Sequence, residues 1–425
     1  MCKHRSVQHM VWGLFWLSLA ATSASAGELE RDRIVSAPFF RDTTLDLHLR
    51  SYYLGRDNFD DSRDRSWAGG GWLSYRSGLL VDTLYLGATL YTSQPIFAPA
   101  DEGGTLLLTS HQNALGSLGE AYVGAKVARQ DFIVGRQSID TPLINPKDNR
   151  MVPITFEGAT LRSSADKDAK FEYIVGYLRR FKPRDSNDFE SISQGFGVDD
   201  FDTGTPFAWF RVRPAAGLTF VAENYWVEDI VNTGYVEGIY QFPRRPVGPQ
   251  YTLAANLITQ NSVGSDLMSA GDAFFTYQAS ARLTVDFGEL ALMFVASTTG
   301  NDAAINFPLG TKPNYTDLQQ VSFDRAGEDA AGVGLTLKLD RLGLKDTTAA
   351  AWYVWGWDAI DAATNASLPD RQELDLSIRY RPTDGLWKGV SLWARYGHVF
   401  SNGAGIRDDQ PELRLIADYT VPLIR

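Results

Sequence analysis

Apolar and polar residues alternate along nearly the whole chain. In residues 45–53, leucines alternate with polar or charged side chains, and the same alternation returns in residues 84–91, 333–339, 374–381 and 412–419. A period of two places one set of side chains on each face of a β-strand. Each of these segments is therefore predicted to be a strand with one apolar face and one polar or charged face.

Counting such segments predicts eighteen strands. Many are about ten residues long, which is the length of a tilted strand that crosses a bilayer. The predicted strands are residues 44–53, 66–77, 79–92, 118–128, 130–138, 156–163, 170–180, 205–213, 217–227, 232–241, 250–260, 271–285, 289–298, 329–339, 347–358, 371–381, 388–399 and 411–421.

Long and short connections alternate between these strands. The long ones are residues 54–65, 93–117, 139–155, 181–204, 299–328, 359–370 and 400–410. Two connections depart from this alternation: 228–231 is short where a long connection is expected, and 242–249 is long where a short one is expected. The pattern predicts an all-β fold, a transmembrane antiparallel up-and-down β-barrel with long extracellular loops and short periplasmic turns. A soluble β-protein also alternates, but here tyrosines often end the apolar faces, as in interfacial girdles.

The N-terminus has the features of an export signal. Lys3 and Arg5 precede an apolar stretch over residues 10–20, and Ala24-Ser25-Ala26 forms a small-x-small cleavage site. We expect residues 1–26 to be a cleaved signal peptide and residues 27–425 to form a single barrel domain in the bacterial outer membrane.

Composition narrows the classes of function. The net charge of −11 argues against a nucleic-acid partner, and the one cysteine, Cys2, is expected to leave with the signal peptide. The remaining histidines are His48, His111 and His398, and no G-x-S-x-G, H-E-x-x-H or phosphate-loop motif is present. We therefore predict a protein that is not an enzyme and that uses no metal and no cofactor.

If the apolar faces meet lipid, their alternates line the lumen. A charge at mid-bilayer on the lipid face costs about 2–4 kcal/mol, so the charged alternates should point inward. The predicted inward bases form a basic ladder that selects small anionic or zwitterionic solutes. Alternatively, these bases pair with wall acids and only stiffen the barrel. The predicted ladder residues are Arg50, Lys126, Arg162, Arg211, Arg282, Arg379, Arg381, Arg395 and Arg414, with Arg213 and Lys338 on the same faces.

The connection over residues 139–155 is a candidate constriction loop. It contains Asp140, Asp148 and Arg150, and its prolines favour an ordered conformation. Such a loop folds into the lumen in some large barrels, although its length also fits an ordinary surface loop.

Three stretches of the chain resemble the OprD-type substrate-specific porins. They are residues 45–53 (LDLHLRSYY), residues 135–158 with the runs GRQ, TP, DNRM and TFEG, and residues 412–419 (ELRLIADY). The resemblance implies an eighteen-stranded barrel with inward-folded loops and a basic ladder on one wall. It also implies diffusive uptake of small carboxylates and amino acids, with Arg150 in the constriction loop and Arg379, Arg395 and Arg414 in the ladder.

The function predicted from the sequence is therefore passive, substrate-selective diffusion of small charged solutes through a basic-lined lumen. The alternatives are a sugar porin and an export channel for an acidic polysaccharide. A sugar porin needs an aromatic track, and the aromatic residues of 352–357 fall on both faces of one strand. The expected partners are outer-membrane lipid and lipopolysaccharide, small solutes and the barrel-assembly machinery, and the expected assembly is a monomer or weak homotrimer.

Overall fold

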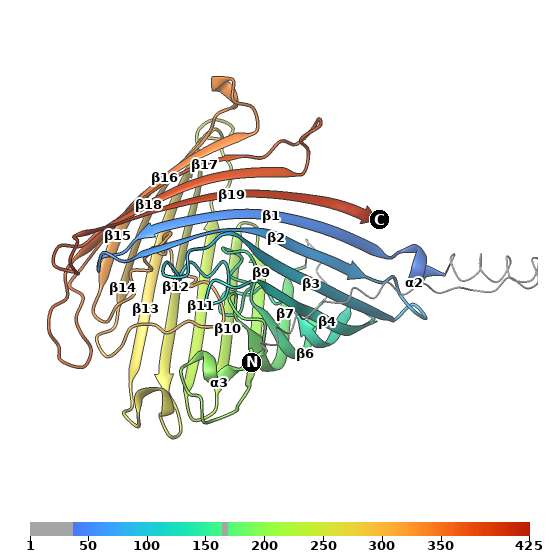
Figure 1. The fold of residues 1–425 in the computed structure, drawn as a ribbon, viewed down its shortest axis with the longest axis horizontal. Helices are drawn as coiled ribbons and strands as arrows, with labels where there is room; N and C mark the ends of the chain where they lie inside the picture. Colours follow the sequence, from blue (N-terminus) through green and yellow to red (C-terminus); the bar gives the residue numbers. More distant parts are fainter. Residues whose placement is uncertain (1–36, 164–168) are drawn as a thin grey trace, which may run out of the picture.

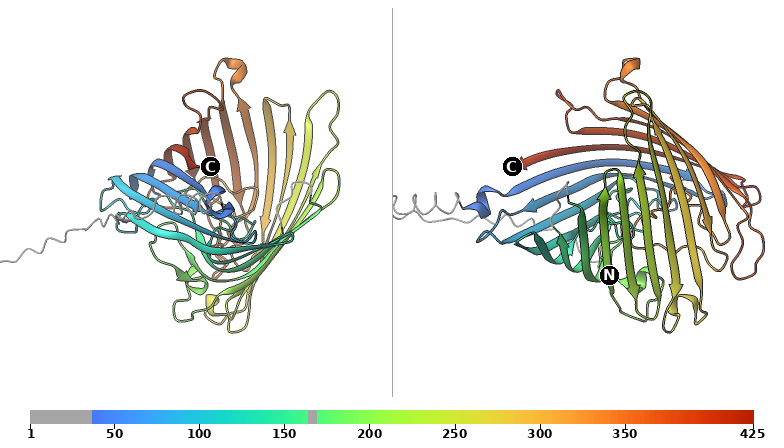
Figure 2. Two further views of the ribbon diagram at one scale, coloured as in Figure 1. Left: turned by 90° about the vertical axis from the view of Figure 1, so that its right-hand side faces the viewer. Right: turned by 180° about the vertical axis from the view of Figure 1, so that it is seen from behind.

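The computed structural model describes residues 37–163 and 169–425. Within them, eighteen long strands and one two-residue strand form a single antiparallel sheet, and β1 pairs with β19 to close it into a barrel (Figures 1 and 2). The strands are β1 (Thr44–Asp57), β2 (Arg63–Arg76), β3 (Leu84–Phe97), β4 (Leu115–Val127), β5 (Gln130–Gln137), β6 (Thr155–Ser163), β7 (Phe171–Lys182), β8 (Glu190–Ser191), β9 (Thr205–Ala215), β10 (Leu218–Val227), β11 (Val231–Gln241), β12 (Gln250–Ser262), β13 (Phe275–Asp286), β14 (Leu290–Thr299), β15 (Asp329–Lys338), β16 (Thr347–Trp357), β17 (Arg371–Tyr380), β18 (Val390–Phe400) and β19 (Asp409–Ile424).

The predicted eighteen-stranded antiparallel barrel is confirmed, and each predicted strand has a counterpart. Two strand starts were placed too early. β3 begins at Leu84 rather than residue 79, because Val81 and Asp82 take positive φ values and form a tight turn. β13 begins at Phe275 rather than residue 271, because the preceding loop contains the short helix η1 (Leu267–Ser269) and a turn.

Most of the predicted long connections lie at one end of the barrel and most of the short turns lie at the other. The predicted long connection 54–65 is wrong, because β1 and β2 extend to Asp57 and from Arg63 and leave only residues 58–62 between them. The short connection between β10 and β11 and the longer one between β11 and β12 are both present, as the sequence indicated. Three further helices in the described residues are short: α2 (Pro38–Arg41) precedes β1, α3 (Ile192–Gly195) lies in the β8–β9 connection, and η2 (Asp340–Leu342) lies in the β15–β16 connection. Within the described ranges no helix is long and apolar enough to cross a membrane. The predicted signal peptide lies outside the described residues.

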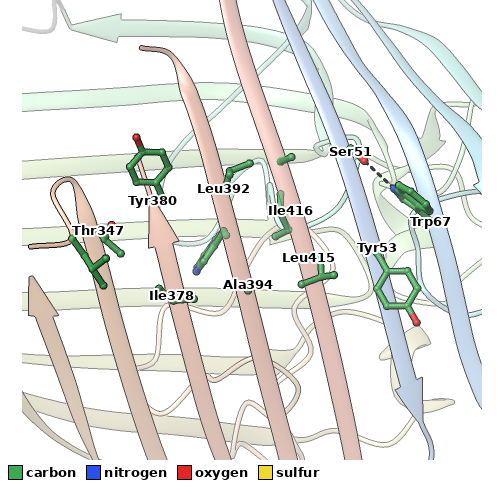
Figure 3. A pocket seen from close by; sticks show the side chains of 13 residues that line it. Ser51, Tyr53, Trp67, Thr347, Ile378, Tyr380, Leu392, Ala394, Leu415 and Ile416 are labelled. Atoms are coloured by element: carbon green, nitrogen blue, oxygen red, sulfur yellow. Dashed lines mark hydrogen bonds between the residues drawn. The ribbon is translucent and has the colours of Figure 1, made fainter. Parts of the chain in front are cut away.

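The outer face of the barrel is apolar. Leu49, Leu86, Leu335 and Leu376, which alternate with polar residues in sequence, are all exposed. A hollow on this face lies over β16 to β19, β1 and β2, between Ile378, Leu392 and Leu415 (Figure 3). At its edge the indole N–H of Trp67 donates to the Ser51 hydroxyl at 2.9 Å, so this polar group does not face hydrocarbon unpaired. This hollow belongs to the lipid-facing surface and not to the lumen.

Buried apolar side chains of three long loops pack against the inner wall. Ile139, Leu143 and Ile144 belong to one cluster with wall residues of β6 to β12, and Ile305, Phe307 and Leu309 join the same cluster. Met151 and Val152 pack with Leu107 and Leu108 against β1 to β3. The loops 98–114, 138–154 and 300–328 therefore fold into the barrel and fill much of its interior.

Candidate functional site

One end of loop 138–154 is fixed to β10. The Glu223 carboxylate accepts hydrogen bonds from the Thr141 hydroxyl and from the Leu143 amide, the latter at 2.8 Å. Glu223 is only 4% exposed. A buried carboxylate is stable only where hydrogen bonds replace its lost water, and both of its oxygens receive one here.

The other end of the loop is fixed to β1. The Arg50 guanidinium donates to Asp148 at 2.6 Å and to the carbonyl oxygen of Arg150 at 2.6 Å. It also donates to Asp418 of β19 at 2.7 Å. The Tyr52 hydroxyl donates to the carbonyl oxygen of Asn149 at 3.2 Å. Arg50 therefore anchors the loop and bridges β1 to β19.

The two anchors lie on nearly opposite walls. β1 and β10 are eight steps apart in the closed order of eighteen long strands, counting from β7 directly to β9. Loop 138–154 starts between them, at the end of β5. It therefore crosses the lumen and divides its cross-section.

Loop 300–328 is a second inward loop, which the sequence did not identify as such. The Glu373 carboxylate accepts from the amides of Gln320 and Val321 at 2.8 Å each, and Asp375 accepts from the Gln319 amide at 3.0 Å. These backbone contacts hold the loop tip against β17. The apolar run around Ile305 to Leu309 was the available signal, but irregular loops also carry such residues on their surface.

The two loops meet at Asn145. Its amide donates to the carbonyl oxygen of Leu309 at 3.1 Å, and its side chain accepts from the Thr311 amide at 2.7 Å. Loop 98–114 joins them, since the Arg150 guanidinium donates to the carbonyl oxygen of Thr105 at 2.8 Å. The three loops form one hydrogen-bonded structure inside the barrel.

Several of the predicted ladder bases already have hydrogen-bond or ion-pair partners in the barrel wall or the inward loops. Arg211 pairs with Glu172 at 2.5 Å, and Arg213 pairs with the same carboxylate at 2.8 Å. Arg414, 2% exposed, pairs with Glu412 at 2.5 Å and donates to the carbonyl oxygen of Gln319 at 2.7 Å. Arg162 donates to the Gln137 side chain at 2.6 Å. For these four arginines the geometry fits wall stiffening rather than solute binding.

A second group of bases lies on aromatic rings, and no carboxylate is within 4.0 Å of them among the described residues. Arg379 and Arg395 lie 4.9 Å and 4.5 Å from the centre of the Trp393 ring. Arg282 lies 4.4 Å from the Tyr315 ring, and Lys126 lies 5.8 Å from the Tyr85 ring. Attraction to the ring face holds such cations in place and leaves their N–H donors available.

Of the predicted ladder bases, Arg379 and Arg395 have the surroundings that best suit binding of a solute. Both project inward from adjacent strands, β17 and β18, and Trp393 is the register partner of Arg379. The Arg379 Nε donates to the Ser391 hydroxyl at 3.0 Å, and its two terminal amino groups have no hydrogen-bond partner among the described residues. Arg381, the next inward base, lies just past the end of β17 and is exposed.

The remaining predicted loop residues differ in environment. Asp140 is exposed, Asp148 is half exposed and paired with Arg50, and Arg150 is 7% exposed and points into loop 98–114. Burial lowers the pKa of Arg150 to about 9. Arg150 therefore fixes the loop and is turned away from the open lumen.

Lys147 and Asp317 are charged loop residues that the sequence did not single out. Burial, followed by the nearby Arg184 guanidinium, lowers the pKa of Lys147 to about 8. Burial raises the pKa of Asp317 to about 6. Both groups belong to the inward loops and influence one another, so the charge of the narrowed lumen changes with pH.

The two strand histidines lie on opposite faces of the barrel wall. His48 stacks on Trp72 with 3.7 Å between ring centres and contacts Asp418 at 3.1 Å, inside the barrel. His398 stacks on Phe400, an exposed residue, and contacts Asp409 at 3.1 Å. The two rings therefore do not share one site, as a catalytic pair would require.

An antiparallel barrel with an apolar outer face and a charged lumen narrowed by loops is an outer-membrane porin. The model of the OprD family, described as an outer membrane porin family, matches residues 37–423, and the chain belongs to this family.

Known proteins similar to this chain cover nearly all of it. Porin D of Pseudomonas aeruginosa is 23% identical over 98% of this chain and 99% of its own length. The porin-like protein GalP of Pseudomonas putida is 24% identical over 96% of this chain and 98% of its own. The crystal structure of Pseudomonas aeruginosa OccK9 (OpdG) covers 91% of this chain and 100% of its own, with a TM-score of 0.80 and 23% identity.

A second solved structure, Pseudomonas aeruginosa OpdK with vanillate, covers 90% of this chain and 99% of its own. Its TM-score is 0.78 and its identity is 18%. At these identities the solved structures establish the fold.

Proposed function

We propose that this porin mediates passive, selective diffusion of small carboxylate-bearing solutes through the outer membrane. The observation that carries the proposal is the pair Arg379 and Arg395. Both guanidinium groups lie against Trp393 on the lumen wall, and neither has a carboxylate partner among the described residues. A guanidinium with free N–H groups binds a carboxylate through two parallel hydrogen bonds.

The lumen arginines that already hold a carboxylate differ from Arg379 and Arg395, and this difference supports the same proposal. Arg211 and Arg414 already hold wall carboxylates, so an added carboxylate would have to compete with a fixed partner. In the described ranges, Arg379 and Arg395 have no such partner to displace. The relative OpdK has been solved with vanillate, an aromatic carboxylate, which fits this class of solute.

A sugar-selective pore has less support. Of the aromatic residues at 352–357, Trp352 alone packs toward the interior, while Tyr353 and Trp355 are exposed on the outer face. A sugar track needs several inward aromatic faces in a row, and β16 supplies one. An exporter of acidic polysaccharide requires a wide lumen, whereas loops 138–154 and 300–328 occupy much of this one.

The test is single-channel current of the refolded protein in planar bilayers with small carboxylates or neutral sugars added. Carboxylates should reduce the current and sugars should not. In Arg395→Ala the carboxylate affinity should fall about tenfold, as expected for loss of one charge-assisted hydrogen-bonded contact.

Arg211→Ala is the matched control, because it removes the same charge from a lumen arginine that already has a carboxylate partner. Equal loss of block in both variants, or block by sugars alone, would contradict the proposal.

A further inference from the structure

Glu223 is a buried acid in apolar surroundings. It faces the lumen from β10 between Val221 and Tyr225, and both of these neighbours belong to the large apolar cluster. No arginine or lysine lies within 4.0 Å of its carboxylate among the described residues. Moving a carboxylate from water into such surroundings is costly unless hydrogen bonds compensate.

Among the described residues, every hydrogen bond to the Glu223 carboxylate comes from loop 138–154. The Thr141 hydroxyl and the Leu143 amide each donate to one carboxylate oxygen. The Thr141 hydroxyl also accepts from the Ile144 amide at 3.2 Å, and the Thr141 amide donates to the carbonyl oxygen of Ile144 at 2.9 Å. The carboxylate thus caps a tight turn over residues 141–144. Within the part of the chain that the structure describes, the carboxylate makes no hydrogen bond to the wall that carries it.

The chain between the two anchors is short. Leu143 is bound by Glu223 and Asp148 by Arg50, and only residues 144–147 lie between them. Five steps along an extended chain span at most about 17 Å. Little slack remains in a segment held from two nearly opposite walls, so its position depends on both anchors.

We infer that Glu223 is a positioning residue that sets the width of the pore. Glu223 fixes the loop at residues 141–143, Arg50 fixes it at Asp148, and the segment 144–147 is held between these two points. The inference rests on the proposed function only in taking this loop as the constriction. Glu223 lies on β10 and touches no solute, yet it controls how much of the lumen the loop closes.

The experiment compares wild type with Glu223→Ala, Glu223→Gln and Thr141→Val in planar bilayers, using potassium chloride alone. Glu223→Ala removes both acceptors and should raise the single-channel conductance by about twofold, with larger open-channel current noise. Glu223→Gln keeps one acceptor oxygen and Thr141→Val removes one donor, so both should give smaller increases.

Glu172→Gln is the matched control. Glu172 is also a buried, inward carboxylate, but its partners are the wall residues Arg211 and Arg213. Like Glu223→Gln, the change replaces a buried inward carboxyl group by an amide, and it should leave both conductance and noise close to wild type.

Folding of each variant is checked by the shift in gel mobility between unheated and boiled samples. Wild-type conductance and noise in folded Glu223→Gln and Thr141→Val would overturn the inference, even if Glu223→Ala does not fold. Absence of carboxylate block in wild type would instead count against the proposed function alone, since the conductance readout uses no carboxylate.

Discussion

Arg414 donates a hydrogen bond of 2.7 Å to the carbonyl oxygen of Gln319, which lies 95 residues away in sequence. The same guanidinium pairs with Glu412 two residues along β19. Arg414 therefore connects the last strand to the tip of loop 300–328, and its fully buried charge is balanced by Glu412 rather than by a solute.

We expect Arg414→Ala to destabilise the folded barrel. The change leaves Glu412 buried, with its nearest other cation Arg56 at 3.6 Å, and removes one support of the loop tip. Breaking one partner of a buried pair costs about 3–5 kcal/mol. Urea unfolding followed by tryptophan fluorescence measures the loss. Arg381→Ala, at an exposed arginine of the same wall, is the control and should unfold like wild type.

Trp393→Ala should weaken carboxylate block while leaving both arginines in the chain. Trp393 supports Arg379 and Arg395 through its ring face, and such contacts contribute about 0.5–1 kcal/mol each where partly exposed. A loss of about two- to fivefold in carboxylate affinity follows from that energy. Trp393→Phe keeps an aromatic face and should lose less. Unchanged block in Trp393→Ala would show that the ring does not position these side chains.

The ion selectivity of the pore should depend on pH in two steps. Above about pH 8 Lys147 loses its proton, so the lumen becomes less positive and anion selectivity falls. Below about pH 6 Asp317 takes up a proton, so a negative charge is lost and anion selectivity rises. Reversal potentials in a salt gradient from pH 5 to pH 9 measure both steps.

Single substitutions separate the two groups. Lys147→Met should abolish the upper step and keep the lower one, and Asp317→Asn should do the reverse. A profile with both steps intact in both variants would assign the titration to other groups.

Asn145→Ala should uncouple the two inward loops. The change removes the side-chain bonds to the Thr311 amide at 2.7 Å and to the carbonyl oxygen of Thr311 at 3.1 Å. Open-channel current noise should increase, because the loops then move independently within the lumen. Asn58→Ala serves as the control. Asn58 lies in the exposed β1–β2 connection and hydrogen-bonds with Ser62, and its loss should leave the open-channel current noise at the wild-type level.

The barrel itself could be predicted from the sequence because lipid and lumen impose opposite preferences on alternate residues. Leu45, Leu47 and Leu49 have no other reason to alternate with Asp46, His48 and Arg50. The same rule predicts which face an arginine takes. It does not predict its partner, since Arg50 reaches an aspartate 98 residues away while Arg395 lies over the Trp393 ring.

The arrangement of the loops could not be predicted in the same way. Loop 300–328 has no period, and its inward course depends on Glu373 and Asp375, which read as ordinary lumen acids in β17. Glu223 shows the same difficulty, because nothing in the sequence of β10 indicates a partner at Thr141. The contacts that narrow the pore join loops to distant strands, and sequence patterns report only local periodicity.

Arg50 links the closure of the barrel to the placement of the inward loop. The first and last strands meet at β1 and β19, and Arg50 binds Asp418 across that seam while it also holds Asp148 of the inward loop. A sheet that has not yet closed lacks one half of this contact set. The full set of contacts through which Arg50 holds the inward loop therefore requires the β1–β19 pairing that closes the barrel.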